Sequence, residues 1–195
     1  MTEKYTSSLT SEAFLFSELK IFLDIMKDKN ANEAKKTIIV ENFYFLKTEN
    51  AIKKIVSIVN KRINALNSEI IEIFYNETHD VQKIINLFSI YKTNKLFHDF
   101  IDEVLIPKYT IEELNFNELT IERYLDEKKE YFPEVKKWSN KTFKNLKSQI
   151  KSILIESNLL ENNQLKKIIL NTEFKNILKE NKEILFLKGI GEDLL

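Results

Sequence analysis

The chain has 195 residues, with 30 lysines and arginines against 30 aspartates and glutamates, so its formal net charge is zero. Hydrophobic residues make up 43% and charged residues 31%, a balance that excludes a disordered chain. The absence of cysteine excludes disulfides, thiolate nucleophiles and cysteine-bound zinc. Because no apolar run approaches the ~20 residues of a membrane span and the N-terminus lacks the apolar core of a signal peptide, we expect a cytoplasmic protein with no membrane contact.

Glycine and proline are scarce, with two of each in the whole chain. Hairpins and tight turns between strands depend on these residues. The sequence therefore predicts an all-α fold, a compact bundle of about nine helices forming a single domain over residues 1–195. A short β-ribbon near Leu159 to Leu170 is the one exception compatible with this prediction. Pro107 divides the chain into two predicted lobes, an N-terminal helical bundle over 1–107 and a C-terminal helical lobe, helix-turn-helix-like, over 108–195.

Three helices are predicted before residue 67. The first follows Ser11, and the second opens at Asn30 with Glu33 three residues later, the spacing of a capping box. The third begins at Thr48 and has the strongest 3.6-residue apolar period of the N-terminal half. We expect this third helix to carry four cationic side chains on its surface: Lys53, Lys54, Lys61 and Arg62.

Shorter helices are predicted from Ser68 to Tyr75, from Thr78 to Tyr91, and from Asn94 to the neighbourhood of Pro107, since proline disfavours a helical residue before it. Thr110 to Glu113 has the spacing of another capping box. Residues 112–134 then hold eight acidic and three basic residues, which makes this stretch strongly negative.

A basic helix follows the acidic stretch. Pro133 is placed to begin a short helix that ends at Trp138, and Ser139 is placed to cap a longer helix over 139–157. Between Glu134 and Glu156 the chain holds six lysines and no acid, a concentration of charge that favours an anionic partner. The alternative is a solvated face that the neighbouring acidic stretch balances.

The functional interpretation is that this helix binds nucleic acid, since recognition helices commonly use their N-terminal residues. Its lysines suit phosphates, and Asn140 suits a bidentate base contact, so we expect binding to the backbone more than sequence readout. The predicted contact residues are Lys137, Asn140, Lys141, Thr142, Lys144, Lys147 and Lys151, with Lys61 and Arg62 on the earlier helix.

Catalytic chemistry has little support. The sequence contains no nucleophile elbow, phosphate-binding loop or H-E-x-x-H motif. His98 and Asp102 lie one helical turn apart and could share a metal, but one histidine and one carboxylate are too few ligands. A histidine at an interface with a carboxylate neighbour is the simpler interpretation. We therefore expect no catalytic residue, no metal and no cofactor.

Short motifs along the chain resemble the BrxA family of BREX bacteriophage-defence systems. They are Tyr5, Glu12, Glu41-Asn42, Lys61-Arg62-Ile63-Asn64-Ala65-Leu66, Trp138-Ser139 followed by Thr142, and the segment from Leu154 to Leu160. The resemblance spans about residues 5 to 190. It implies a helical fold similar to the NusB antitermination protein and a non-enzymatic role beside other BREX components.

Three functions follow from these observations. The first is binding of double-stranded DNA through the basic helical face. The second is a scaffold that docks other BREX proteins through its apolar and acidic faces. The third is RNA binding in the manner of NusB. The sequence leaves the oligomeric state open.

Overall fold

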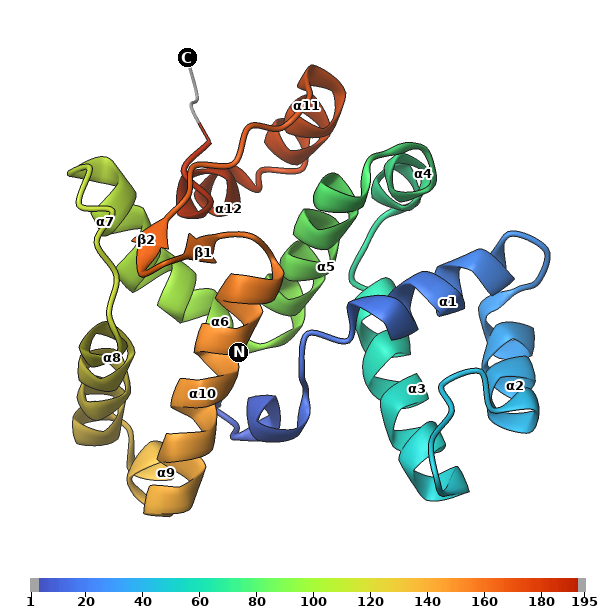
Figure 1. Ribbon diagram of the computed structural model, residues 1–195, viewed down its shortest axis with the longest axis horizontal. Helices are drawn as coiled ribbons and strands as arrows, with labels where there is room; N and C mark the ends of the chain where they lie inside the picture. Colours follow the sequence, from blue (N-terminus) through green and yellow to red (C-terminus); the bar gives the residue numbers. More distant parts are fainter. Residues whose placement is uncertain (1–3, 193–195) are drawn as a thin grey trace.

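The computed structural model describes residues 4–192, which fold into helices with a single two-stranded hairpin as the sheet of that range (Figure 1). The all-α prediction is confirmed, and the hairpin lies in the one region where a short β-ribbon was compatible with it. The helices are α1 (Phe16–Met26), α2 (Ala31–Glu41), α3 (Glu49–Ile63), α4 (Ser68–Asn76), α5 (His79–Thr93), α6 (Lys95–Phe100), α7 (Ile106–Thr110), α8 (Glu118–Tyr131), α9 (Pro133–Lys136), α10 (Asn140–Glu156), α11 (Thr172–Glu180) and α12 (Ile184–Gly189). The strands are β1 (Leu160–Glu161) and β2 (Gln164–Leu165).

Most helix starts follow from local capping. The Asn30 side chain accepts from the backbone of Glu33 while the Glu33 side chain accepts from Asn30 N–H, so the predicted capping box is present. Thr48 caps α3 as predicted. The first helix begins later than predicted, at Phe16, because Ser11 ends a 3-10 turn and Leu15 takes a left-handed conformation with φ of 52°. An extra turn of irregular chain therefore precedes α1.

Arg62 is not on the surface of α3, so its predicted placement there is wrong. Its side chain is 1% exposed. The guanidinium donates to Phe14 O at 2.8 Å and to Ala13 O at 2.9 Å, which ties the irregular chain before α1 to α3. Burial lowers the pKa of Arg62 to about 10, which still leaves the group charged at neutral pH.

The loop between α2 and α3 holds Phe45 in an unusual state. Phe45 has φ of 52° and is 88% exposed. Asn42 fixes the loop, because its side-chain amide donates to Leu46 O and its amide oxygen accepts from Leu46 N–H, both at 3.0 Å. A large side chain is thus kept in the left-handed region without burial to offset the strain.

Replacing Phe45 with asparagine is expected to raise the free energy of unfolding by about 0.5–1 kcal/mol, because asparagine tolerates the left-handed region. Urea denaturation followed by circular dichroism measures the change. Phe43→Asn is the matched control, since Phe43 is 39% exposed and its φ is not positive. Equal effects of the two substitutions would contradict the assignment of strain to Phe45.

The helix after Asn94 does not stop at Pro107, contrary to the prediction. A π-helical turn, Ile101–Leu105, joins α6 to α7, and Ile106 N–H donates to Ile101 O. Proline lacks an N–H and disrupts a regular helix interior, but it fits the first turn of a helix. The π turn places Pro107 in the first turn of α7. The helical path therefore continues through the proline, and the proposed division into lobes at this residue stays a prediction.

Thr110 does not open a helix either. It ends α7, and its hydroxyl donates to Ile106 O at 2.8 Å. The next helix, α8, begins at Glu118, where the Asn117 side chain accepts from Thr120 N–H. The predicted capping box from Thr110 to Glu113 is wrong because the threonine hydroxyl is used by the preceding turn.

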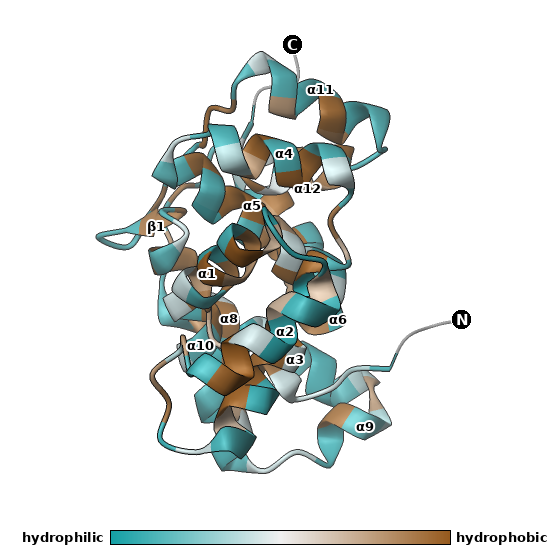
Figure 2. Ribbon diagram, turned by 90° about the vertical axis from the view of Figure 1, so that its right-hand side faces the viewer, coloured by the Kyte–Doolittle hydropathy of each residue, from teal (hydrophilic) through white to brown (hydrophobic). Residues whose placement is uncertain are grey.

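The apolar core runs from the N-terminal segment to the last helix. Buried side chains of every helix from α1 to α12 contribute to one cluster, with α5 packed against α1, α3, α4 and α6. The view coloured by hydropathy shows apolar and polar stretches alternating along the helices (Figure 2). Among residues 4–192, no helix has the length and apolar content to cross a bilayer.

Candidate nucleic-acid interface

The basic helix belongs to a compact unit of three helices and a hairpin. Helix α8 packs on α9 and α10, and β1 and β2 follow α10 directly. The extended segment 114–116, between α7 and α8, runs beside β2. The order along the chain is α7, the extended segment, α8, the short helix α9, α10 and the hairpin. A winged helix-turn-helix unit has this order of elements, and α10 stands at the position of its recognition helix.

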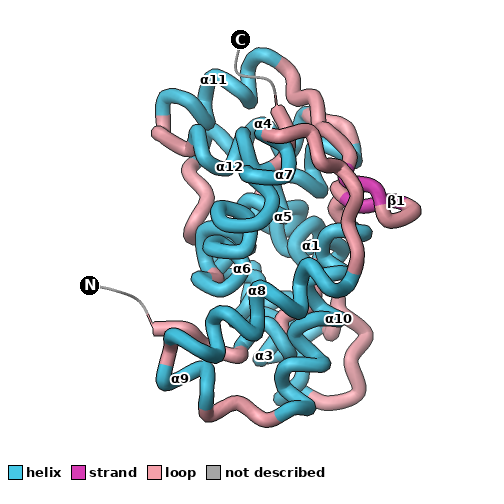
Figure 3. Tube along the Cα trace, turned by 90° about the vertical axis from the view of Figure 1, so that its left-hand side faces the viewer, coloured by secondary structure: helices cyan, strands magenta, loops and turns pink. Residues whose placement is uncertain are grey.

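The hairpin is held firmly by backbone hydrogen bonds. Leu165 N–H donates to Leu114 O at 2.8 Å, and Phe116 N–H donates to Asn163 O at 3.0 Å. Asn162 and Asn163 form the turn with φ of 51° and 59°, the left-handed values that a two-residue hairpin turn requires. The hairpin projects from the side of the molecule that carries α10 (Figures 2 and 3).

The unit is also fixed to the central helices. Tyr124 of α8 donates to Leu96 O of α6 at 2.7 Å, and burial raises the pKa of its phenol, which keeps it a neutral donor. Lys128 is 5% exposed and donates to both carboxylate oxygens of Glu103 at 2.6 Å. Its ammonium also lies 5.4 Å from the ring centroid of Tyr5 in the N-terminal segment. These contacts give α10 a defined orientation on the molecule.

Helix α10 forms as the sequence predicts. Ser139 caps it, accepting from Thr142 N–H at 3.2 Å, and Pro133 opens the short helix α9 before it. Its inner face is buried at four positions: Leu146, Ile150, Ile153 and Leu154. Phe143 is only partly buried and packs against Trp138 with ring centroids 5.9 Å apart.

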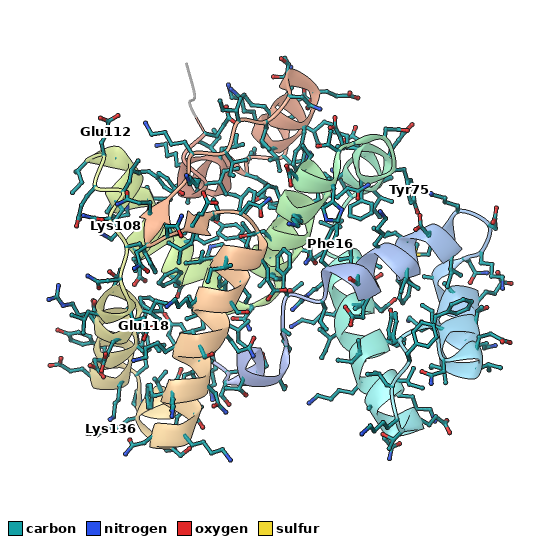
Figure 4. All side chains as sticks on the ribbon, in the orientation of Figure 1. Phe16, Tyr75, Lys108, Glu112, Glu118 and Lys136 are labelled. Carbon is teal, nitrogen blue, oxygen red and sulfur yellow. The ribbon has the colours of Figure 1, made fainter. Side chains whose placement is uncertain are left out.

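The structure divides the predicted contact residues into groups. Lys137, Asn140, Lys141 and Lys144 are exposed together at the N-terminal end of α10, and within residues 4–192 none of them has a hydrogen-bond or ion-pair partner. Thr142 is partly buried, and its hydroxyl lies 3.0 Å from that of the capping Ser139. Lys136, just before them, lies at the same end of the unit (Figure 4).

Lys147 and Lys151 are paired with the acidic helix α8. Lys151 Nζ lies 2.6 Å from a carboxylate oxygen of Glu118, and Lys147 Nζ lies 3.6 Å from Glu122 and 3.9 Å from Glu118. The hydrogen bond from Lys151 lowers the pKa of the Glu118 carboxyl. Glu118 is labelled on α8 in Figure 4. The acidic stretch thus balances these two lysines and leaves those of the first turns uncompensated.

A groove of about 270 Å³ separates α8 from α10. Asn140 and Lys144 line one side of it, and Glu122 and Asp126 line the other. Asn140, the residue predicted to suit a base contact, therefore lies at the edge nearest the acids.

The second predicted basic surface is not continuous with α10, because α3 lies across the molecule from it (Figure 1). Lys61 is exposed and donates to Thr93 O at 2.8 Å. Arg62 is buried among backbone carbonyls, as described above, and so cannot reach a phosphate. Of the other lysines on α3, Lys53 is paired with Glu49 at 2.5 Å, and Lys54 is exposed without an ion-pair partner within residues 4–192.

Sequence reasoning missed two residues of α10 and the tip of the hairpin. Asn145 and Ser148 are fully on the exposed side of the helix, and Asn162 and Asn163 are exposed at the turn. The helical period does place Asn145 and Ser148 near Lys141, at about 40° and 20° from it. Their lack of charge kept them out of a search directed at lysines.

His98 and Asp102 lie as the simpler interpretation predicts. His98 Nε2 is 3.4 Å from the Asp102 carboxylate, and its ring stacks on Tyr91 with centroids 4.0 Å apart. Burial raises the pKa of Asp102, and the nearby histidine opposes this shift. In the described part of the chain, no group of three or more histidine, aspartate or glutamate side chains is placed to hold a metal ion.

The fold and this unit together define the class of the protein: an all-helical protein in which, within residues 4–192, one two-stranded hairpin directly follows a lysine-rich helix. Comparison with known proteins gives the family. The family model described as BrxA matches residues 3–182. A BREX protein BrxA of Bacillus cereus (strain H3081.97) is 30% identical over 159 residues, which cover 81% of this chain and 80% of that protein. The chain belongs to the BrxA family, which supports a role as an accessory protein of BREX phage defence.

The fold also recurs in a solved structure. The crystal structure of an uncharacterized protein from Magnetospirillum magneticum is similar with a TM-score of 0.77, over 96% of this chain and 98% of that one. The two sequences are 17% identical, so the similarity concerns the fold alone.

Proposed function

We propose that this protein is a non-enzymatic member of a BREX phage-defence system that binds double-stranded DNA with the exposed face of α10 in the major groove. The observation that carries the proposal is the exposed N-terminal end of α10, where Lys137, Lys141 and Lys144 have no ion-pair partner within residues 4–192. A major groove admits one α-helix, and lysines at its edges attract the phosphates on either side. The zero net charge of the chain does not oppose this, since attraction to phosphate depends on local charge.

The hairpin supports the same mode of binding. It projects on the α10 side of the molecule, where a helix lying in the major groove would bring it to the adjacent backbone or minor groove (Figures 2 and 3). Its tip offers the amides of Asn162 and Asn163. The deep, narrow major groove of duplex RNA does not admit a helix in this way. We therefore expect duplex DNA to bind more tightly than duplex RNA.

The test is a salt titration of binding to an unrelated DNA duplex. The triple variant K137E/K141E/K144E is expected to lose binding at ~50 mM salt. A second variant carries alanine at the same three positions and should bind weakly. Each phosphate contact contributes about 0.9 to the slope of log affinity against log salt concentration, so the parent's slope should be steeper than this variant's by about 2.7. Mobility shift and fluorescence anisotropy measure both quantities.

A triple variant of α3, K53E/K54E/K61E, is the matched control because it changes the net charge by the same amount. It should bind nearly as well as the parent. If this control loses binding and the α10 variant keeps it, the site is on α3. If the parent shows no salt-dependent binding to duplex DNA, the DNA-binding proposal is wrong, and tighter binding to RNA would favour the NusB-like function.

One observation favours a second function, the docking of another BREX protein. Val40, Phe43 and Phe45 are exposed together around the loop between α2 and α3, at 77%, 39% and 88%. Exposed apolar clusters of this kind mark protein interaction sites. If the protein has this second function, Phe45→Asn should weaken its association with a partner, and K137E/K141E/K144E should leave the association unchanged. A pull-down of co-expressed BREX components measures both.

A further inference from the structure

The centre of the exposed face of α10 is polar but uncharged. At about 100° per residue, Asn145, Ser148 and Ser152 fall within about 40° of Lys141, while Lys144 lies about 60° to one side. Lys147 and Lys151 lie still further toward α8 and are paired with its glutamates. After Lys141 the face thus presents the Asn145 amide and the Ser148 hydroxyl, with Lys144 on the α8 side. Further along, Ser152 donates to Glu156 at 2.8 Å and Ile155 is exposed.

Asn145 has no structural role that explains its position. Other asparagines, such as Asn30, Asn67 and Asn117, cap helices by accepting from a backbone N–H, whereas Asn145 is not at a cap. Asn145 is exposed inside a 17-residue helix and has no hydrogen-bond partner within residues 4–192. Asparagine is a poor residue for a helix interior, and lysine or alanine would stabilise α10 more.

We infer that α10 reads base sequence, with Asn145 as a base-contacting residue that recognises adenine. This inference rests on the proposed function, in which α10 enters the major groove. An asparagine amide offers a donor and an acceptor that match adenine N7 and N6 in that groove. The Ser148 hydroxyl, one turn further along, can donate to or accept from either base of the next pairs.

This inference departs from the expectation that α10 binds the DNA backbone more than it reads sequence. The lysines of the first turns supply attraction to any duplex, and they carry no sequence information. Asn145 lies one turn after Lys141 on the same side, so a helix positioned by phosphate contacts at its edges presents this amide to the base edges. Asn140, at the rim of the groove beside α8, lies about 140° from Asn145 and cannot share this role.

The experiment is selection of bound sequences from a randomised duplex library with the full-length protein. We expect an enriched sequence with a defined adenine. Asn145→Ala should lower the affinity for this sequence by about 5- to 150-fold and remove the preference for adenine. Its affinity for unrelated duplex and its salt slope should match those of the parent, since no phosphate contact is lost.

Asn176→Ala is the matched control, because Asn176 is also an exposed asparagine inside a helix, α11, away from α10 (Figure 1). It should bind like the parent, and thermal melts should show both variants folded. Salt-dependent binding by the parent without any enriched sequence would overturn the inference and leave the proposed function standing. An enriched sequence that Asn145→Ala binds as tightly as the parent does would also overturn it. Failure of the parent to bind any duplex would end both.

Discussion

Replacing Arg62 with methionine is expected to lower the free energy of unfolding by about 3 kcal/mol. The guanidinium donates to three consecutive backbone carbonyls, those of Glu12, Ala13 and Phe14, at 3.4, 2.9 and 2.8 Å. Methionine fills much of the same volume but leaves these acceptors without their charged donor, and each hydrogen bond to a charged group contributes about 1.5–3 kcal/mol. The Asn86 amide still donates to Phe14 O, which limits the loss.

Chemical denaturation measures this change, and Lys54→Met is the control on the same helix. Lys54 is exposed, so its substitution should stay within ~0.5 kcal/mol. Arg62→Lys should lower the free energy of unfolding by most of the same amount, since an ammonium cannot reproduce the forked donors of the guanidinium. A variant Arg62→Met as stable as the parent would show that the carbonyls find other donors.

Replacing Ile150 with alanine is expected to cost about 2–5 kcal/mol, because the side chain is fully buried between α10 and its neighbours and its loss leaves a cavity. Phe143→Ala in the same helix should cost less, since Phe143 is only partly buried. Equilibrium unfolding of both variants gives the two values. If Phe143→Ala proved the more damaging of the two, the orientation of α10 would differ from that described here.

Ile150→Ala and the charge-reversal variant K137E/K141E/K144E together separate folding from binding. At temperatures where the Ile150→Ala protein remains folded, it should retain affinity for duplex DNA because the exposed lysines are unchanged. The charge-reversal variant of α10 should show the opposite behaviour, normal stability and no binding, since exposed positions away from caps contribute little to stability.

The sequence by itself determined the fold class and the start of most helices. Scarcity of glycine and proline excluded an extensive sheet, and capping side chains at Asn30, Thr48 and Ser139 marked helix starts that the structure confirms. A cap acts between residues two or three apart, so its signal is complete within a few residues of sequence. The inner face of α10 was equally predictable, because one helical period fixes it.

Only the tertiary structure decided which charged side chains are free. Arg62 looked like a surface residue beside Lys61, yet its partners lie 48 to 50 residues away and bury it. In the sequence, Lys147 and Lys151 cannot be distinguished from Lys141. In the structure, the packing of α10 against α8 places glutamates beside Lys147 and Lys151. The charge and the apolar period of a segment describe that helix alone. The ionic partners of its side chains belong to a different helix, and only packing brings them together.

The tertiary structure also decided the backbone at Pro107 and the surface that α10 presents to solvent. A π-helical turn placed the proline in a first helical turn, where its missing N–H does no harm. Docking of α10 on α8 turned Asn140 toward the acidic groove and left Asn145 in the open. Such outcomes depend on how helices pack, and packing is set by contacts between residues distant in sequence rather than by any local pattern.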